Sequence, residues 1–273
     1  MLYPMILIIL NWDGSLMPKT KGRGHSKKAT VDKADGLSKL LSQHVNTVKR
    51  ILEKYPTYPQ IYYFIDAYAG PGYNKEEQCD GSPMIFLKTA EKLKIDYCAW
   101  FVEEDIASVK ELRERIKGYR NCEVLPFDNA RSVPEIARGL PDNAFGLVYA
   151  DPNGIPDIDM LSKVSIIPKL NKFDILIRYN TTAVKRNEPQ TGERMLDHLS
   201  RINKTHWIIR KPRAGDIWQW TFLLGLNWGG LNDWKSQGFL YAITPEGIKQ
   251  EAVDIINKLN YTKDERLTLG GWQ

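Results

Sequence analysis

The chain has 273 residues, of which 42% are hydrophobic and 26% are charged, and its formal net charge is +5. This composition is ordinary for a globular protein and excludes collagen-like, low-complexity and small disulfide-rich classes. The length suits one sizeable α/β core, and so small a net charge does not by itself indicate a nucleic-acid partner.

The cysteines and histidines indicate neither a disulfide framework nor a metal site. Cys79, Cys98 and Cys122 are an odd number without the spacing of metal ligands, and no histidine lies within four residues of a cysteine. We therefore expect a reducing, cytoplasmic location and no bound metal.

The first 36 residues differ from the rest. Residues 2–10 are apolar but lack a basic leader and are too short to span a bilayer, so no membrane partner is expected. Met17 is a more ordinary start, and residues 1–16 are interpreted as an over-extended gene start, with an edge strand or interfacial anchor as the alternative. Residues 19–36 are basic and glycine-containing, which predicts a flexible arm; binding of nucleic acid by this arm is the alternative.

A single domain is expected over residues 37–273, with residues 181–273 as a divergent C-terminal part. Apolar residues at helical spacing predict a helix from Leu37 to about Tyr55. A further helix is predicted to follow Asp105 and to end at about Lys117. Other helices are predicted at residues 82–93, 131–139, 157–165 and 246–259. Strands are predicted at residues 61–66, 97–102, 123–127, 145–150, 173–178, 206–210, 220–226 and 239–243.

This order predicts the fold class. Strands alternating with helices indicate an α/β protein with a mostly parallel sheet and helices on both faces. The strands at 206–210 and 220–226 are expected to form an antiparallel C-terminal hairpin. Five tryptophans in this last third, beside Arg210, Lys211 and Arg213, are interpreted as core residues, with a base-stacking surface as the alternative.

The first strand runs into Asp66 and then into a glycine turn at Gly70-Pro-Gly72. Such a turn lets a backbone approach a ligand closely. A phosphate-binding loop would continue with Lys and Ser or Thr, and a dinucleotide fingerprint would place a third glycine at position 75, where Lys75 stands. The turn therefore predicts a ligand without a pyrophosphate.

Acidic residues end the first four predicted strands: Asp66, Glu103, Asp128 and Asp151. Parallel sheets bind ligands at the carboxyl ends of their strands. A pyrophosphate would meet like charge among these carboxylates, so NAD or ATP without a metal is disfavoured. S-adenosylmethionine, which has an ammonium, a sulfonium and no phosphate, suits them better.

Each predicted cofactor-binding residue has an expected partner on S-adenosylmethionine. Asp66 would favour the ammonium directly or through water, and N–H groups near Gly70 and Gly72 would leave room for the methionine part. Glu103 would accept from both ribose hydroxyls. Asp128 would accept from the adenine amino group, with Asn129 beside it.

The stretches FIDAYAGPG, GSPMIFL, FVEED, FDNA and YADPNG occur in this order. They resemble the three-Cys-motif partner (TcmP) family, which is similar to class I S-adenosylmethionine-dependent methyltransferases. The resemblance covers about residues 37–180 and weakens beyond them. It implies a seven-stranded Rossmann-like sheet with an antiparallel hairpin at one end, the same cofactor contacts, and a three-Cys-motif protein as a partner.

The fourth acidic strand end departs from the pattern of methyltransferases that act on the amino groups of bases. Those enzymes have an acid or Asn, then Pro-Pro and an aromatic, whereas this chain has Asp151-Pro152-Asn153-Gly154. Asp151 and Asn153 are the predicted catalytic residues, with Asp151 orienting a nucleophile or accepting its proton. Stacking on a substrate would come from elsewhere, for example Tyr68, Tyr149 or Tyr179.

The sequence therefore predicts a methyltransferase whose methyl acceptor is unknown. One alternative is an S-adenosylmethionine-binding partner or regulatory protein without turnover, which the substitution at Asn153 favours. The other is a different nucleic-acid-acting protein, which the basic arm and the Trp/Arg-rich end favour.

Overall fold

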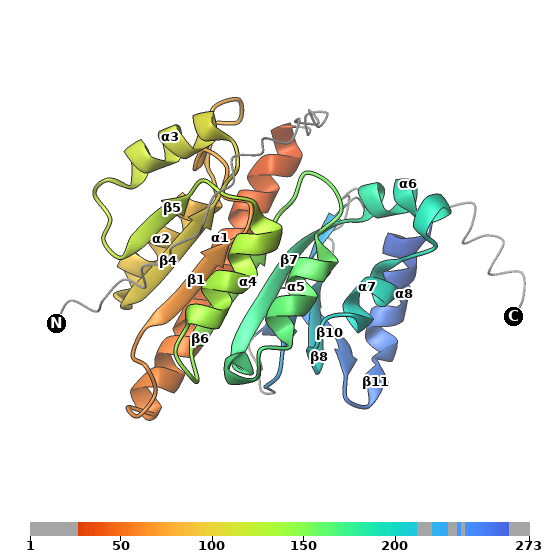
Figure 1. The fold of residues 1–273 in the computed structure, drawn as a ribbon. Helices are drawn as coiled ribbons and strands as arrows, with labels where there is room; N and C mark the ends of the chain where they lie inside the picture. The colour runs from red at the N-terminus through yellow and green to blue at the C-terminus, as the bar shows by residue number, and fades with distance from the viewer. Residues whose placement is uncertain (1–26, 212–219, 229–233, 236–237, 262–273) are drawn as a thin grey trace, which may run out of the picture. The chain divides into compact units, whose positions relative to one another are not determined.

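The computed structural model describes residues 27–211, 220–228, 234–235 and 238–261 (Figure 1). The chain forms two compact units, Met1–Gly146 and Leu147–Gln273. The proposed gene-start segment, residues 19–26 of the basic arm, Arg213 and Trp218 lie outside the described residues.

The first unit begins with helix α1 (Lys27–Lys54), which starts well before the predicted Leu37. The expectation of a flexible arm is therefore wrong for residues 27–36. Lysine and alanine favour a helix in this segment, and Lys39 donates to the Asp35 carboxylate one turn earlier, at 2.8 Å. The apolar face that we used to place the start of the helix begins only at Leu37.

Three parallel strands form the sheet of the first unit: β1 (Tyr62–Asp66), β4 (Tyr97–Val102) and β5 (Cys122–Leu125). β4 lies between the other two, with Phe64 opposite Ala99 and Phe101 opposite Val124. All residues of β1 are buried, as expected of a parallel strand covered on both faces.

Helices α2 (Ser82–Leu93), α3 (Ile106–Ile116) and α4 (Asn129–Gly139) follow the strands of this unit. In Figure 1, α4 lies in front of these strands and α1 behind them. Gly81 is the N-cap of α2, with Pro83 in the first turn of the helix. The segment before α2 contains a short antiparallel pair, β2 (Tyr73–Asn74) and β3 (Cys79–Asp80).

Strand β6 (Phe145–Ala150) begins at the last two residues of the first unit and continues into the second, and β7 (Phe173–Asn180) lies beside it. β9 (Trp220–Leu226) pairs antiparallel with both β7 and β8 (His206–Arg210), and β8 pairs antiparallel with β10 (Phe239–Thr244). β11 (Gly247–Ile248) forms the edge. The predicted C-terminal hairpin is confirmed, and β10 and β11 extend the sheet beyond it.

The helices of the second unit are α5 (Ile158–Ser165), α6 (Thr181–Thr191), α7 (Met195–Ser200) and α8 (Gln250–Asn260), with a 3-10 turn at Pro168–Leu170. α6 and α7 were not predicted from the sequence. α6 carries Pro189 and few apolar residues, and α7 is only six residues long, so neither shows helical periodicity.

The parallel strands, interleaved helices and antiparallel C-terminal strands confirm the predicted α/β fold class. Trp207 and Trp234 are buried, which confirms the core interpretation for these two tryptophans. No helix in the described part of the chain combines the length and apolar character needed to cross a membrane.

Candidate functional site

The first acidic strand end is fully buried. Asp66 is the last residue of β1 and has no exposed surface. Its carboxylate accepts a hydrogen bond from the backbone N–H of Tyr68 at 3.1 Å, two residues on. This bond closes an Asx turn. Asp66 therefore starts the turn that leads from the strand to the two glycines.

The second acidic strand end contacts this glycine turn directly. Glu103 follows β4, and its carboxylate accepts from the N–H of Gly70 and from the N–H of Asp105, each at 2.8 Å. The N–H of Ala69 also donates to the carbonyl of Val102 at 3.0 Å. These bonds fix a carboxylate, a strong acceptor, at the carboxyl end of the parallel sheet.

The two glycines of the turn have different environments. Both have positive φ angles, +60° at Gly70 and +75° at Gly72, a region that L side chains avoid. A Cβ at Gly72 would lie 2.7 Å from Leu112 Cδ1 on α3, whereas no described atom lies within 4 Å of a Cβ at Gly70. Gly72 is thus closely packed against α3, whereas the space around Gly70 is open.

The two predicted residues after β5, Asp128 and Asn129, make different contacts. Asp128 is exposed and caps α4, accepting from the N–H of Arg131 at 3.1 Å. Asn129, the first residue of α4, donates from its side chain to the carbonyl of Ala67 at 3.4 Å. Asn129 therefore reaches the glycine turn, while the Asp128 carboxylate is directed to its own helix.

In the second unit, Asp151 follows β6 and is held by two side chains. Its carboxylate accepts from Arg178 Nη1 at 2.9 Å and from the hydroxyl of Tyr149 at 3.2 Å. The Arg178 side chain is only 2% exposed, against 26% for Asp151. Asn153 is exposed, and no hydrogen bond of its side chain occurs among the described residues.

Arg178 is a site residue that the sequence analysis missed. Its guanidinium lies 5.8 Å from the ring centre of Trp220, and that of Arg210 lies 5.0 Å from the same ring. The available signal was a charged residue near the end of a strand that is otherwise apolar.

Two of the three tyrosines considered for stacking are unsuited to it. Tyr149 and Tyr179 are 2% and 1% exposed, and their hydroxyls bond to Asp151 and to His198. Their rings belong to the core of the second unit, so that expectation is wrong for both. Tyr68 is half-buried.

The structure thus brings together Asp66, Gly70, Glu103 and Asn129 around one turn of the first unit. The described residues contain no group of three His, Cys, Asp or Glu side chains placed to hold a metal ion.

No protein-family model matches the chain, and no curated protein is similar to it. Solved structures align with it at low identity, among them the following three. Protein LPL1258 from Legionella pneumophila, described with the family model DUF519, is 11% identical, with 77% of this chain and 97% of that chain covered and a TM-score of 0.48. DszA carbon methyltransferase is 14% identical over 71% of this chain and 55% of its own, with a TM-score of 0.46.

An rRNA methylase from Streptococcus thermophilus is 10% identical, with 74% of this chain and 99% of that chain covered and a TM-score of 0.39. All three TM-scores are below 0.5, so these similarities carry no argument about what this chain does.

Proposed function

We propose that the chain is an S-adenosylmethionine-dependent methyltransferase-like protein of the three-Cys-motif partner type, whose methyl acceptor is unknown. The observation that carries the proposal is the Glu103 carboxylate, fixed at the end of β4 against the N–H of Gly70. A carboxylate at this strand end is suited to hydroxyl donors such as those of a ribose.

The residues of the first unit fit a cofactor without phosphates. The turn offers open space at Gly70 and a carboxylate at Glu103, and neither feature would favour a pyrophosphate. Asp66 would act through the shape of the turn, because its side chain is buried. Asn129 would hold the turn at Ala67, and Asp128 would contribute chiefly by placing the start of α4.

In methyl transfer, S-adenosylmethionine would supply an electrophilic methyl group on its sulfonium. The protein would contribute mainly by holding the acceptor in line with that group. Asp151 is proposed to accept a hydrogen bond or a proton from the nucleophile. Arg178 and Tyr149 fix the orientation of its carboxylate.

A second candidate function is cofactor binding without turnover. The residues that follow β6, from Asp151 to Gly154, favour it. The Asp151 carboxylate already accepts from a buried guanidinium and a phenol, and neither Asn153 nor Gly154 supplies an aromatic ring. A protein of this kind would keep the cofactor site and act as a partner or regulator.

The partners and location are part of the proposal. The TcmP resemblance favours a three-Cys-motif protein as partner. The basic N-terminal residues and the Trp/Arg-rich C-terminal part favour nucleic acid. The cysteine content favours the cytoplasm.

Calorimetric titration with S-adenosylmethionine tests the proposal. We expect binding by the wild type, a loss of at least about tenfold in Glu103→Ala, and no change in Glu104→Ala, whose side chain is the exposed neighbour. Absence of binding at millimolar cofactor would refute both functions. Binding without transfer of a radiolabelled methyl group to protein, nucleic-acid or small-molecule fractions would favour the second.

A further inference from the structure

Trp220 is an aromatic residue at the end of the sheet to which we assign methyl transfer. It begins β9, opposite Asn180 at the end of β7. In the sheet β7 lies between β9 and β6, and Asp151 directly follows β6. Because Asp151 contacts Arg178 near the end of β7, its carboxylate and the Trp220 ring lie at the same end of three neighbouring strands.

The Arg178 guanidinium links this ring to the carboxylate. Its Nη1 donates to Asp151 Oδ1 at 2.9 Å, and its central carbon lies 5.8 Å from the centre of the Trp220 ring. A cation at such a distance from an indole is attracted to the ring face. The ring also meets the buried Phe222 in a T-shaped contact, with 5.4 Å between the two centres, and Trp220 is only half-buried. Trp220 is therefore an aromatic surface that is held in place and still partly accessible.

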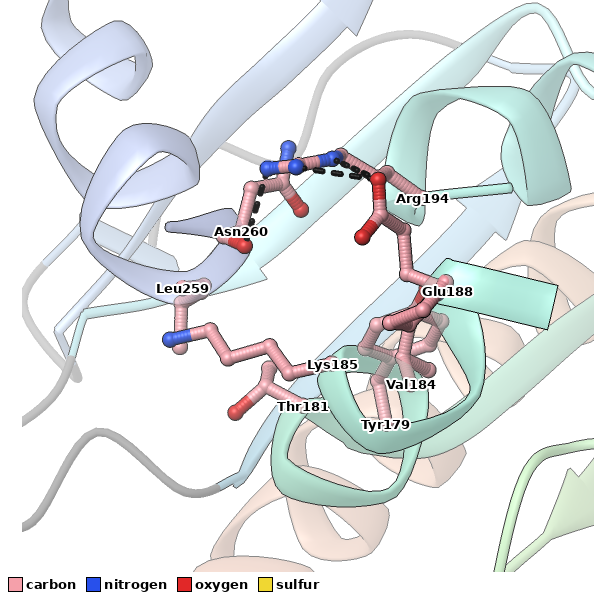
Figure 2. Close-up of a pocket in the computed structure, with 9 residues that line it drawn as sticks. Tyr179, Thr181, Val184, Lys185, Glu188, Arg194, Leu259 and Asn260 are labelled. Carbon is pink, nitrogen blue, oxygen red and sulfur yellow. Dashed lines mark hydrogen bonds and ion pairs between the residues drawn. The ribbon is translucent and has the colours of Figure 1, made fainter. Parts of the chain in front are cut away.

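One edge of the Arg178 guanidinium makes no hydrogen bond in the described part of the chain. The side chain is 2% exposed, its bond to Asp151 uses Nη1, and its Nε is buried without a partner. In Arg194 the corresponding edge, Nε with Nη2, donates two bonds to Glu188 Oε1, at 3.2 and 3.0 Å (Figure 2). Because buried donors are generally paired, the same edge of Arg178 favours a ligand that supplies an acceptor.

The Asp151 carboxylate favours a donor on the same ligand. It accepts two hydrogen bonds from described residues and its side chain is 26% exposed, whereas a carboxylate has about four acceptor positions. A flat ring with an amino group next to a ring acceptor supplies the donor and the acceptor together. Cytosine and adenine are rings of this kind. Carboxylates accept from the cytosine amino group, and bases stack on aromatic side chains.

We propose that the acceptor of the methyl group is the exocyclic amino group of a nucleobase that stacks on Trp220. This inference rests on the proposed function and names its substrate class. The amino group donates to Asp151, and the neighbouring ring acceptor binds the Nε edge of Arg178. The lone pair of the amino nitrogen forms the bond to the methyl carbon, the bond from that carbon to sulfur breaks with its electron pair on sulfur, and one amino proton passes to Asp151.

The pocket between α6 and the end of α8 is unsuited to such a ring (Figure 2). Its volume is about 120 Å³. A cavity of about 150 Å³ holds benzene, and a nucleobase is larger than benzene. The partly exposed Trp220 ring sets no such limit on the size of the ligand.

Calorimetric titration of the full chain at pH 7 with cytidine tests this proposal. Cytidine is used because adenosine is a part of the proposed cofactor. The analogue N4,N4-dimethylcytidine keeps the ring but lacks both amino N–H donors. We expect cytidine to bind at least about tenfold more tightly than this analogue. Equal affinities, or no binding of cytidine at millimolar concentration, would overturn the proposal.

Substitutions of Trp220 test the stacking. Trp220→Leu removes the aromatic ring and should lower the affinity for cytidine about tenfold, whereas Trp220→Phe keeps a ring and should stay within about threefold of the wild type. Trp228→Leu, just beyond the other end of β9, is the matched control and should leave cytidine binding unchanged. An unchanged affinity in Trp220→Leu would contradict the stacking.

Substitution of Asp151 tests the contact with the amino group. Asp151→Asn can present an amide donor in place of an acceptor, so it should lower the affinity for cytidine about tenfold and leave that for N4,N4-dimethylcytidine unchanged. Equal effects on both ligands would overturn this contact. A single-stranded oligocytidylate that binds more tightly than cytidine indicates a nucleic-acid strand as the source of the base, and equal affinities indicate a free nucleoside; the stacking on Trp220 holds in both cases.

Circular dichroism and thermal unfolding establish that each variant folds. If Trp220→Leu does not fold, the indole N–H signal of Trp220 in the labelled wild type provides the second measurement. Cytidine should shift this signal, and an unchanged signal would overturn the proposal. These titrations contain no S-adenosylmethionine, so a failure of cytidine binding is distinguishable from a failure of the proposed cofactor site.

Discussion

Replacing Gly70 and Gly72 by alanine, one at a time, distinguishes the glycine that packs against α3 from the glycine proposed to lie beside the ligand. At Gly72 an alanine would adopt φ +75° and place its Cβ 2.7 Å from Leu112 Cδ1. The left-handed backbone costs about 1–2 kcal/mol, and overpacking costs about 1–3 kcal/mol. We therefore expect Gly72→Ala to lower the free energy of unfolding by about 2–5 kcal/mol, summing these two terms.

Gly70→Ala is the matched comparison, because φ is +60° but no described atom lies within 4 Å of the new Cβ. Its cost should be only the backbone term, about 1–2 kcal/mol. Urea denaturation monitored by circular dichroism measures both changes. Gly70→Ala should also lower the affinity for S-adenosylmethionine, because the new methyl group enters the space proposed for the ligand.

A double variant measures the cost of the steric overlap between the new Cβ at position 72 and the Leu112 side chain. Leu112→Ala removes the atom nearest to the new Cβ, so Gly72→Ala should cost less in that background than in the wild type. Equal losses of stability at the two glycines would refute the packing of this turn against α3.

Three further predictions concern stability. Asp151→Ala should cost about 3–5 kcal/mol in urea denaturation because it leaves the buried Arg178 without its carboxylate; Arg178→Met should cost less, since Asp151 is 26% exposed and can hydrate. Burial lowers the pKa of His198 from 6.5, against the opposing effect of Glu193, so the unfolded chain protonates first. Stability should therefore be full above about pH 6.5 and fall below it; thermal unfolding should show a weaker fall in His198→Gln, and an equal fall would contradict this assignment. Asp128→Ala should cost about 1 kcal/mol through loss of the cap of α4, and no loss of stability would rule out that cap.

The regular elements were largely predictable because apolar runs ended at clear breaks. The predicted strands at 97–102, 145–150, 206–210 and 220–226 have the observed bounds. The helices that were not predicted from the sequence are those without a clear apolar periodicity of their own. The first turns of α1 have no apolar periodicity, and α6 and α7 are short segments between better-marked elements.

The positions of the candidate residues in the fold were predictable, but the directions of their side chains were less so. Strand–helix alternation places Asp66, Glu103 and Asp128 at strand ends, where the structure has them. It does not indicate that Asp66 is buried, that Asp128 caps α4, or that Asp151 contacts Arg178. These outcomes depend on contacts between residues distant in the sequence, which spacing does not encode.

The most direct test of the central proposal is an NMR titration of the labelled protein with S-adenosylmethionine. The account predicts shifts of the amide signals of Gly70 and Asp105, whose N–H groups contact Glu103, and smaller effects with NAD at equal concentration. Unchanged signals at both amides, or a stronger response to NAD, would contradict it.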